Sequence, residues 1–171
     1  MLSVVGAILI IGATAALGFS SVWRMGARVR VLNGLIAALE TMKSEICDRM
    51  TPIPELMNQL IRESDPPLDR LFHRVAGGLT TIGIRSFYFI WKSAVEESEE
   101  LTLTKEERQT LIDLGRSLGR YDAEEQRDAF RYTLRRLESH LRKAEQERRE
   151  QGRVHAVLGI AAGVFVVMIL L

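Results

Sequence analysis

The charged side chains of this chain are confined to its middle. The first is Arg24 and the last is Arg153, so 23 residues at one end and 18 at the other contain no Asp, Glu, Lys or Arg. Between them, 23 Lys and Arg residues and 22 Asp and Glu residues leave a formal net charge of +1. The fold must therefore keep two apolar ends out of water and expose a charged middle to it. Near-balanced charge gives no reason to expect nucleic-acid binding, which usually shows a strong basic excess.

Both ends are long enough to cross a bilayer as helices. At the standard helical rise, residues 1–23 extend about 34 Å and residues 154–171 about 27 Å, close to a hydrocarbon core of about 30 Å. A cleaved signal peptide is the alternative for the first end, because residues 13–15 read Ala-Thr-Ala. No Lys or Arg precedes the apolar run, however, which disfavours a signal peptide. We predict transmembrane helices over 1–23 and 154–171, around a domain of residues 24–153.

The positions of Lys and Arg beside these ends predict a topology. Basic residues follow the first span and precede the second, whereas the outer flanks have none. The positive-inside rule then places the middle domain in the cytoplasm and both termini outside. Basic residues near the second span would also contact anionic lipid headgroups. Within that span, Gly159 and Gly163 form a G-x-x-x-G pair that lets membrane helices approach closely; a small-residue stripe without this role is the alternative.

The apolar residues of the middle domain recur at helical spacing. We expect its first helix to continue from the first span and to end at Thr51-Pro52, with Thr51 capping the next helix and Pro52 at its first position. We expect residues 65–67, Asp-Pro-Pro, to cap a third helix and residues 85–100 to form a fourth.

Clear boundaries mark the last two helices. Thr104 with Glu107 forms a capping-box pattern, and Gly119 suits the left-handed end of that helix. Asp122 with Glu125 starts the last helix in the same way, and no Pro follows before the end of the chain. The sequence therefore predicts an all-α protein, a cytoplasmic six-helix bundle flanked by an N-terminal and a C-terminal transmembrane helix.

No pattern typical of catalysis or of a cofactor occurs. The chain lacks a phosphate-binding glycine loop and a metal-binding His spacing, and His73, His140 and His155 are far apart. Its single cysteine, Cys47, can form neither an internal disulfide nor a Cys-based zinc site. We expect no enzyme activity, no cofactor and no metal.

Three arginines in the last predicted helix form a stripe. Arg127, Arg131 and Arg135 recur every four residues and so share one face. A solvated face with local ion pairs is one interpretation. The other is a docking surface for an acidic region of a partner.

Two segments of the chain resemble segments of a known family. Residues 45–53, with Glu45-Ile46 and Thr51-Pro52-Ile53, resemble the E-I-x4-T-P-L segment of the stage III sporulation protein AB family. Residues 114–126, L-G-x-x-L-G-x-x-D-x-x-x-Q, resemble a second segment of that family. Ile53 and Pro54 depart from the first pattern. Glu45 and Gln126 could hydrogen-bond to each other across the bundle or face a partner.

The resemblance implies a place in a larger machine. The family belongs to a channel-like complex between mother cell and forespore that includes a secretion-type ATPase. The AB member is similar to the inner-membrane platform protein of type II secretion and type IV pilus systems. We therefore expect a platform on the mother-cell side that couples the ATPase to other membrane subunits. A purely structural, self-associating tether without a motor partner is the alternative.

Overall fold

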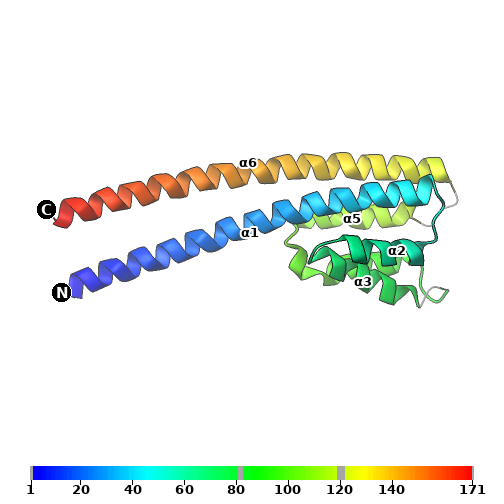
Figure 1. The fold of residues 1–171 in the computed structure, drawn as a ribbon, viewed down its shortest axis with the longest axis horizontal. Helices are drawn as coiled ribbons and strands as arrows, with labels where there is room; N and C mark the ends of the chain where they lie inside the picture. The colour runs from blue at the N-terminus through cyan, green and yellow to red at the C-terminus, as the bar shows by residue number, and fades with distance from the viewer. Residues whose placement is uncertain (1, 81–82, 119–121, 171) are drawn as a thin grey trace. The chain divides into compact units, whose positions relative to one another are not determined.

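In the part of the chain that the computed structural model describes, the regular elements are helices (Figure 1). The structure describes residues 2–80, 83–118 and 122–170, and the side chains of residues 24–80, 83–118 and 122–150. In this part of the chain there are six α-helices, one short 3-10 helix and no strand. The prediction of an all-α protein with six helices is therefore confirmed.

The first and last helices are several times longer than the others. Helix α1 runs over Leu2–Cys47 and helix α6 over Ala123–Leu170, both without interruption. Each helix passes through both compact units of the chain, which are residues 1–27 with 143–171 and residues 28–142. The expected continuity of the first and last domain helices with the chain ends is thus present in the backbone.

A search of the described residues finds no helix that is long and apolar enough to cross a membrane. The two predicted spans, residues 1–23 and 154–171, lie in segments whose side chains are outside the described part. Gly159 and Gly163 lie there too, so their packing stays a prediction.

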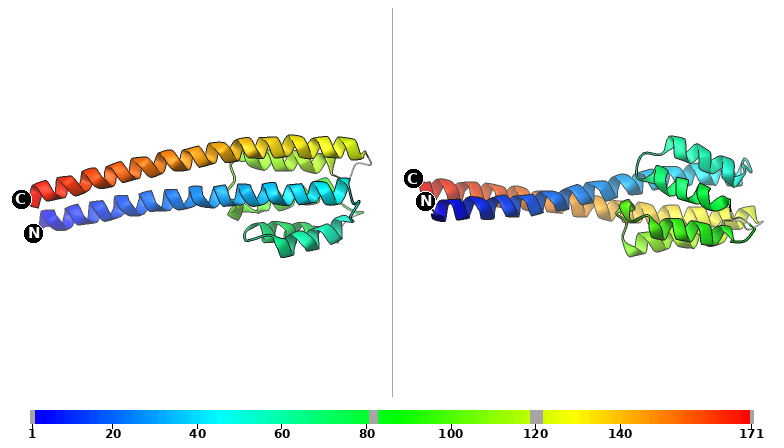
Figure 2. Two further views of the ribbon diagram at one scale, coloured as in Figure 1. Left: turned by 45° about the horizontal axis from the view of Figure 1, so that its top comes forward. Right: turned by 90° about the horizontal axis from the view of Figure 1, so that it is seen from below.

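Four shorter α-helices complete the unit of residues 28–142. They are α2 (Ile53–Glu63), α3 (Leu68–Leu79), α4 (Phe87–Glu97) and α5 (Lys105–Ser117), with a 3-10 turn at Glu99–Leu101. Successive helices pack side by side, α2 on α3, α3 on α4 and α4 on α5 (Figure 2). The core of this unit contains the predicted apolar faces, including the fully buried Phe72 of α3, Trp91 of α4 and Phe130 of α6.

Two expected caps are wrong. Helix α2 begins at Ile53 with Pro52 as its N-cap residue, and no side chain caps it. Thr51 lies one residue too early, and its hydroxyl donates to Glu45 instead. Helix α3 has Pro67 at its N-cap position, also without a side-chain cap. Helix α4 is shorter than expected, because Ser98 leaves the helical conformation and the chain continues as the 3-10 turn.

The caps expected for the last two helices are present. Thr104 accepts a hydrogen bond from the Glu107 backbone N–H, and the Glu107 carboxylate accepts one from the Thr104 backbone N–H. Asp122 accepts hydrogen bonds from the backbone N–H groups of Glu124 and Glu125 at the start of α6. Gly119, the expected end of α5, lies outside the described residues.

Close packing of α4 against α5 depends on Gly115. A Cβ atom at this position would lie 2.5 Å from Cδ1 of Trp91, whose indole N–H donates to the Leu111 carbonyl oxygen at 2.7 Å. The ring is fully buried and is held by that hydrogen bond, so it cannot move aside without losing its partner. The first glycine of the L-G-x-x-L-G segment therefore makes room for Trp91.

We predict that Gly115→Ala destabilises the protein by about 1–3 kcal/mol, the usual effect of overpacking a core. The matched control is Gly77→Ala in α3, where an added Cβ meets nothing within 4 Å. Alanine is the better helix former, so this control gains up to about 1 kcal/mol. Urea unfolding of the full chain in mild detergent, followed by circular dichroism, measures both. Equal midpoints for the two variants would contradict the packing argument.

Candidate functional site

A buried ion pair joins α1 to α5. Nη2 of Arg28 lies 2.7 Å from Oε1 of Glu107, and Nε donates to the same carboxylate. The Glu107 side chain is fully buried and that of Arg28 is 15% exposed. Glu107 thus starts α5 through its capping box and also binds α1. Seventy-nine residues separate the partners, so no local sequence pattern predicts this pair.

Burial alone raises the pKa of the Glu107 carboxyl, because it removes the charged form from water. The hydrogen bonds from Arg28 and Thr104 and the charge of Arg28 outweigh burial, and the net pKa is lowered from 4.5. Glu107 is therefore ionised at neutral pH, and its charge stabilises the folded state.

Glu45 closes the end of α1. Its carboxylate accepts hydrogen bonds from Arg49 at 2.7 Å and from the Thr51 hydroxyl at 2.6 Å, and its carbonyl accepts the Thr51 backbone N–H at 2.8 Å. The side chain is buried. The E-I-x4-T-P segment therefore has a local structural role, fixing the turn that leads to α2. Gln126, the other polar candidate, is also buried, within the first turn of α6.

The arginine stripe divides into two parts. Arg127 binds the end of α1, with Nη2 2.9 Å from Oδ1 of Asp48 and within 3.4 Å of the Cys47 carbonyl oxygen. It also pairs with Glu124 at 2.6 Å. These contacts tie the start of α6 to α1, so Arg127 has a role inside the domain.

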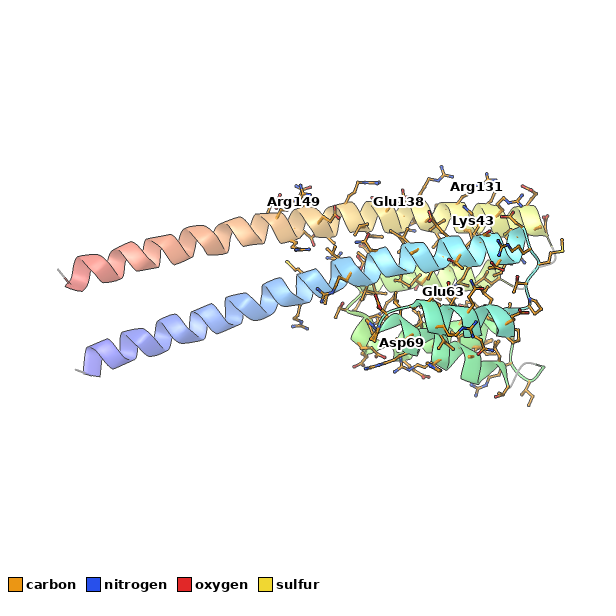
Figure 3. The ribbon with its side chains drawn as sticks, viewed as in Figure 1. Lys43, Glu63, Asp69, Arg131, Glu138 and Arg149 are labelled. Atoms are coloured by element: carbon orange, nitrogen blue, oxygen red, sulfur yellow. The ribbon has the colours of Figure 1, made fainter. Side chains whose placement is uncertain are left out.

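Arg131 and Arg135 instead remain on the surface of α6. Arg131 lies on the outer side of the helix (Figure 3), and its ion pair is the local one with Asp128 at 3.2 Å. Next to them, the Tyr132 ring is 59% exposed, and Arg136 lies over it with its guanidinium carbon 5.7 Å from the ring centre. We call Arg131, Tyr132, Arg135 and Arg136 the basic surface of α6. Tyr132 and Arg136 extend the sequence prediction, and their spacing of four was the available signal.

Within the described residues, no group of three or more His, Cys, Asp or Glu side chains could hold a metal ion. The polar clusters found here connect helices or present charge to solvent.

Comparisons with known proteins agree on one family. The model of the family described as stage III sporulation protein AB matches residues 3–171. Stage III sporulation protein AB of Bacillus subtilis (strain 168) is 28% identical over 172 residues, which cover all of both chains. A solved structure of stage III sporulation protein AB is similar with a TM-score of 0.66 and 27% identity, and it covers 72% of this chain and 97% of its own.

We predict that Arg28→Met destabilises the protein by about 3–5 kcal/mol, since it leaves a buried carboxylate without its cation. In the parent protein, the Glu107 contribution is present above pH 4.5 and is lost as the pH falls through the lowered folded-state pKa. In Arg28→Met, burial disfavours the charged form of the Glu107 carboxyl. The loss of stability relative to the parent protein should therefore be smaller at acid pH, where this carboxyl is protonated.

The double variant Arg28→Met/Glu107→Gln removes both charges while the amide keeps the capping pattern. It should lose less stability than the sum of the two single variants. Urea unfolding midpoints at neutral and acid pH measure these effects. A pH-independent deficit in Arg28→Met, or strict additivity, would show that the ion pair does not contribute as described.

Proposed function

This chain belongs to the stage III sporulation protein AB family, and on that premise we propose that it is a non-enzymatic platform of a sporulation channel between mother cell and forespore. In this proposal the two charge-free ends span the membrane and both termini lie outside. The charged helical domain lies in the mother-cell cytoplasm and binds a secretion-type ATPase. The spans contact other membrane subunits and the lipid bilayer.

The observation that carries the proposal is the continuity of α1 and α6. Each is one uninterrupted helix that contains a predicted span and a helix of the charged domain. A continuous helix keeps its backbone hydrogen bonds from turn to turn, so a displacement at one part is passed along its axis. The Arg28–Glu107 pair and the Arg127–Asp48 pair anchor these two helices within the domain.

The basic surface of α6 is the proposed contact for the ATPase. Exposed arginines beside an aromatic ring suit an acidic protein surface, because Arg and Tyr are enriched in binding interfaces. Charge complementarity of this kind guides association and selects the partner.

The alternative is a tether that self-associates through its last helix. The apolar face of that helix includes Phe130, Leu134 and Leu137, which are buried inside the domain. They are therefore unavailable to a second chain without unfolding, and this burial favours the platform over the tether.

We predict that Arg131→Glu/Arg135→Glu weakens co-purification of the full chain with its ATPase by about tenfold or more, since repulsion replaces attraction at the contact. The matched control is Arg62→Glu/Arg70→Glu, the same charge change at exposed positions of α2 and α3. Arg127→Glu should instead lower stability, because it breaks the contact with Asp48. Unchanged ATPase binding by the first variant would remove this surface from the proposal.

A second prediction tests the continuous helices. Seven residues inserted between Ala27 and Arg28 add close to two helical turns. An Ala-rich helical insert should preserve sporulation, whereas a Gly-Ser insert of equal length should abolish it, because flexible linkers do not pass on displacement. Spore counts, with protein abundance as control, measure the outcome. Equal sporulation with both inserts would indicate tethering alone.

A further inference from the structure

Two large apolar side chains lie exposed together around the start of α4. Ile84 is 90% exposed and Phe89 is 58% exposed. With Arg85, Ser86 and Ser93 they line a shallow groove. Single exposed apolar residues are common on protein surfaces, but a group around one hollow marks an interaction surface. The proposed contact on α6 does not use this groove.

The groove is formed by a connection and a helix. Ile84 and Arg85 lie in the connection before α4, and the extended Ser86 is the N-cap residue of the helix. Phe89 and Ser93 lie one turn apart inside α4, so a large ring stands next to a small side chain. The opposite side of α4 is buried in the core, and the helix therefore cannot rotate to bury Phe89. Cover for this ring has to come from outside the described part of the chain.

The charge around the groove is positive. Arg85 is the one charged side chain in the described lining, and within the described residues it makes no ion pair. The Tyr88 ring contacts the Phe89 ring edge-on, with 5.7 Å between their centres, and the guanidinium carbon of Arg116 lies 5.6 Å from the Tyr88 ring centre. Arg116 also pairs locally with Asp113 at 3.1 Å, which leaves Arg85 as the uncompensated cation. The N-terminal end of α4, where the groove lies, adds a partial positive charge.

These features together select the chemistry of an occupant. A large apolar side chain that packs against Phe89 and Ile84 removes apolar area from water. A carboxylate next to that side chain can bind the guanidinium of Arg85 and accept a hydrogen bond from the Ser86 hydroxyl. A basic segment would instead be repelled by Arg85. The groove is therefore complementary to a segment in which Asp or Glu neighbours a large apolar residue.

We propose that the groove at the start of α4 binds an acidic segment of another protein that carries a large apolar side chain. The apolar side chain packs against Phe89 and Ile84, and the carboxylates face Arg85. The groove occupies only a small part of the surface, so the contact is smaller than a standard interface of about 1,600 Å². The contact does not use the basic surface of α6, so this proposal and the proposed ATPase contact can each fail without the other.

Photocrosslinking of the full chain in sporulating cells tests this assignment. A photoreactive amino acid replaces Ile84, which lines the groove and whose side chain is outside the core. Mass spectrometry then reads the sequence of the captured segment. The expected result is a segment of another protein with more Asp and Glu than Lys and Arg and with a large apolar residue. The matched control carries the same photoreactive amino acid at Asn58, exposed on α2, and should not capture that segment.

Variants of the position-84 chain test the two proposed contacts. Phe89→Asp should lower the yield of the crosslinked segment by about tenfold or more, because it removes the apolar anchor. Arg85→Glu should lower it similarly, whereas Arg85→Lys keeps the charge and should retain most of the yield. The matched control Arg62→Glu makes the same charge change on α2 and should leave the yield unchanged. Circular dichroism of each purified variant verifies folding.

Three results would overturn the proposal. The first is a captured segment without an excess of Asp and Glu, which includes a basic segment. The second is capture of a second copy of this chain, or of no protein, at position 84. The third is an acidic segment whose yield does not fall in Phe89→Asp or in Arg85→Glu, because that segment would then bind another surface.

Discussion

The fully buried carboxylate of Glu107 connects the start of one helix to the side of another. It accepts the Thr104 backbone N–H and so fixes where α5 begins, and it binds Arg28 of α1 at 2.7 Å. Desolvating both charges is costly and is offset only while the pair stays intact. Since α1 is one uninterrupted helix from Leu2 to Cys47, this contact joins α5 to the same helix that contains the first predicted span. The Arg127–Asp48 pair attaches the start of α6 to the C-terminal end of α1.

Most of the helices could be predicted from local features. These features are the apolar spacing, the capping box at Thr104 and the cap at Asp122. Each depends on interactions between residues only a few positions apart, so the sequence shows it directly. The side-chain caps predicted for α2 and α3 are wrong because proline takes the N-cap position in both. The use of Thr51 by Glu45 could not be recognised, since it depends on how the chain turns after α1.

The candidate site was less predictable for a similar reason. An arginine stripe is visible in the sequence, but whether each arginine faces solvent or another helix depends on tertiary packing. Arg127 reaches Asp48, 79 residues away, and so differs from Arg131 although the helical spacing is identical. The two family segments have different structural roles, because Gly115 makes room for Trp91 whereas Glu45 binds the turn that ends α1. Both roles are structural, and the exposed residues of α6 carry the proposed binding to the ATPase.

In the proposed function, the helical domain binds a motor while its long helices continue into the membrane. The most direct measurement is photocrosslinking in sporulating cells with a photoreactive amino acid at position 135, followed by mass identification of the captured protein. The account predicts a secretion-type ATPase, with loss of the crosslink when Arg131 is changed to Glu. Capture of other copies of this chain alone, or of no protein at all, would contradict it.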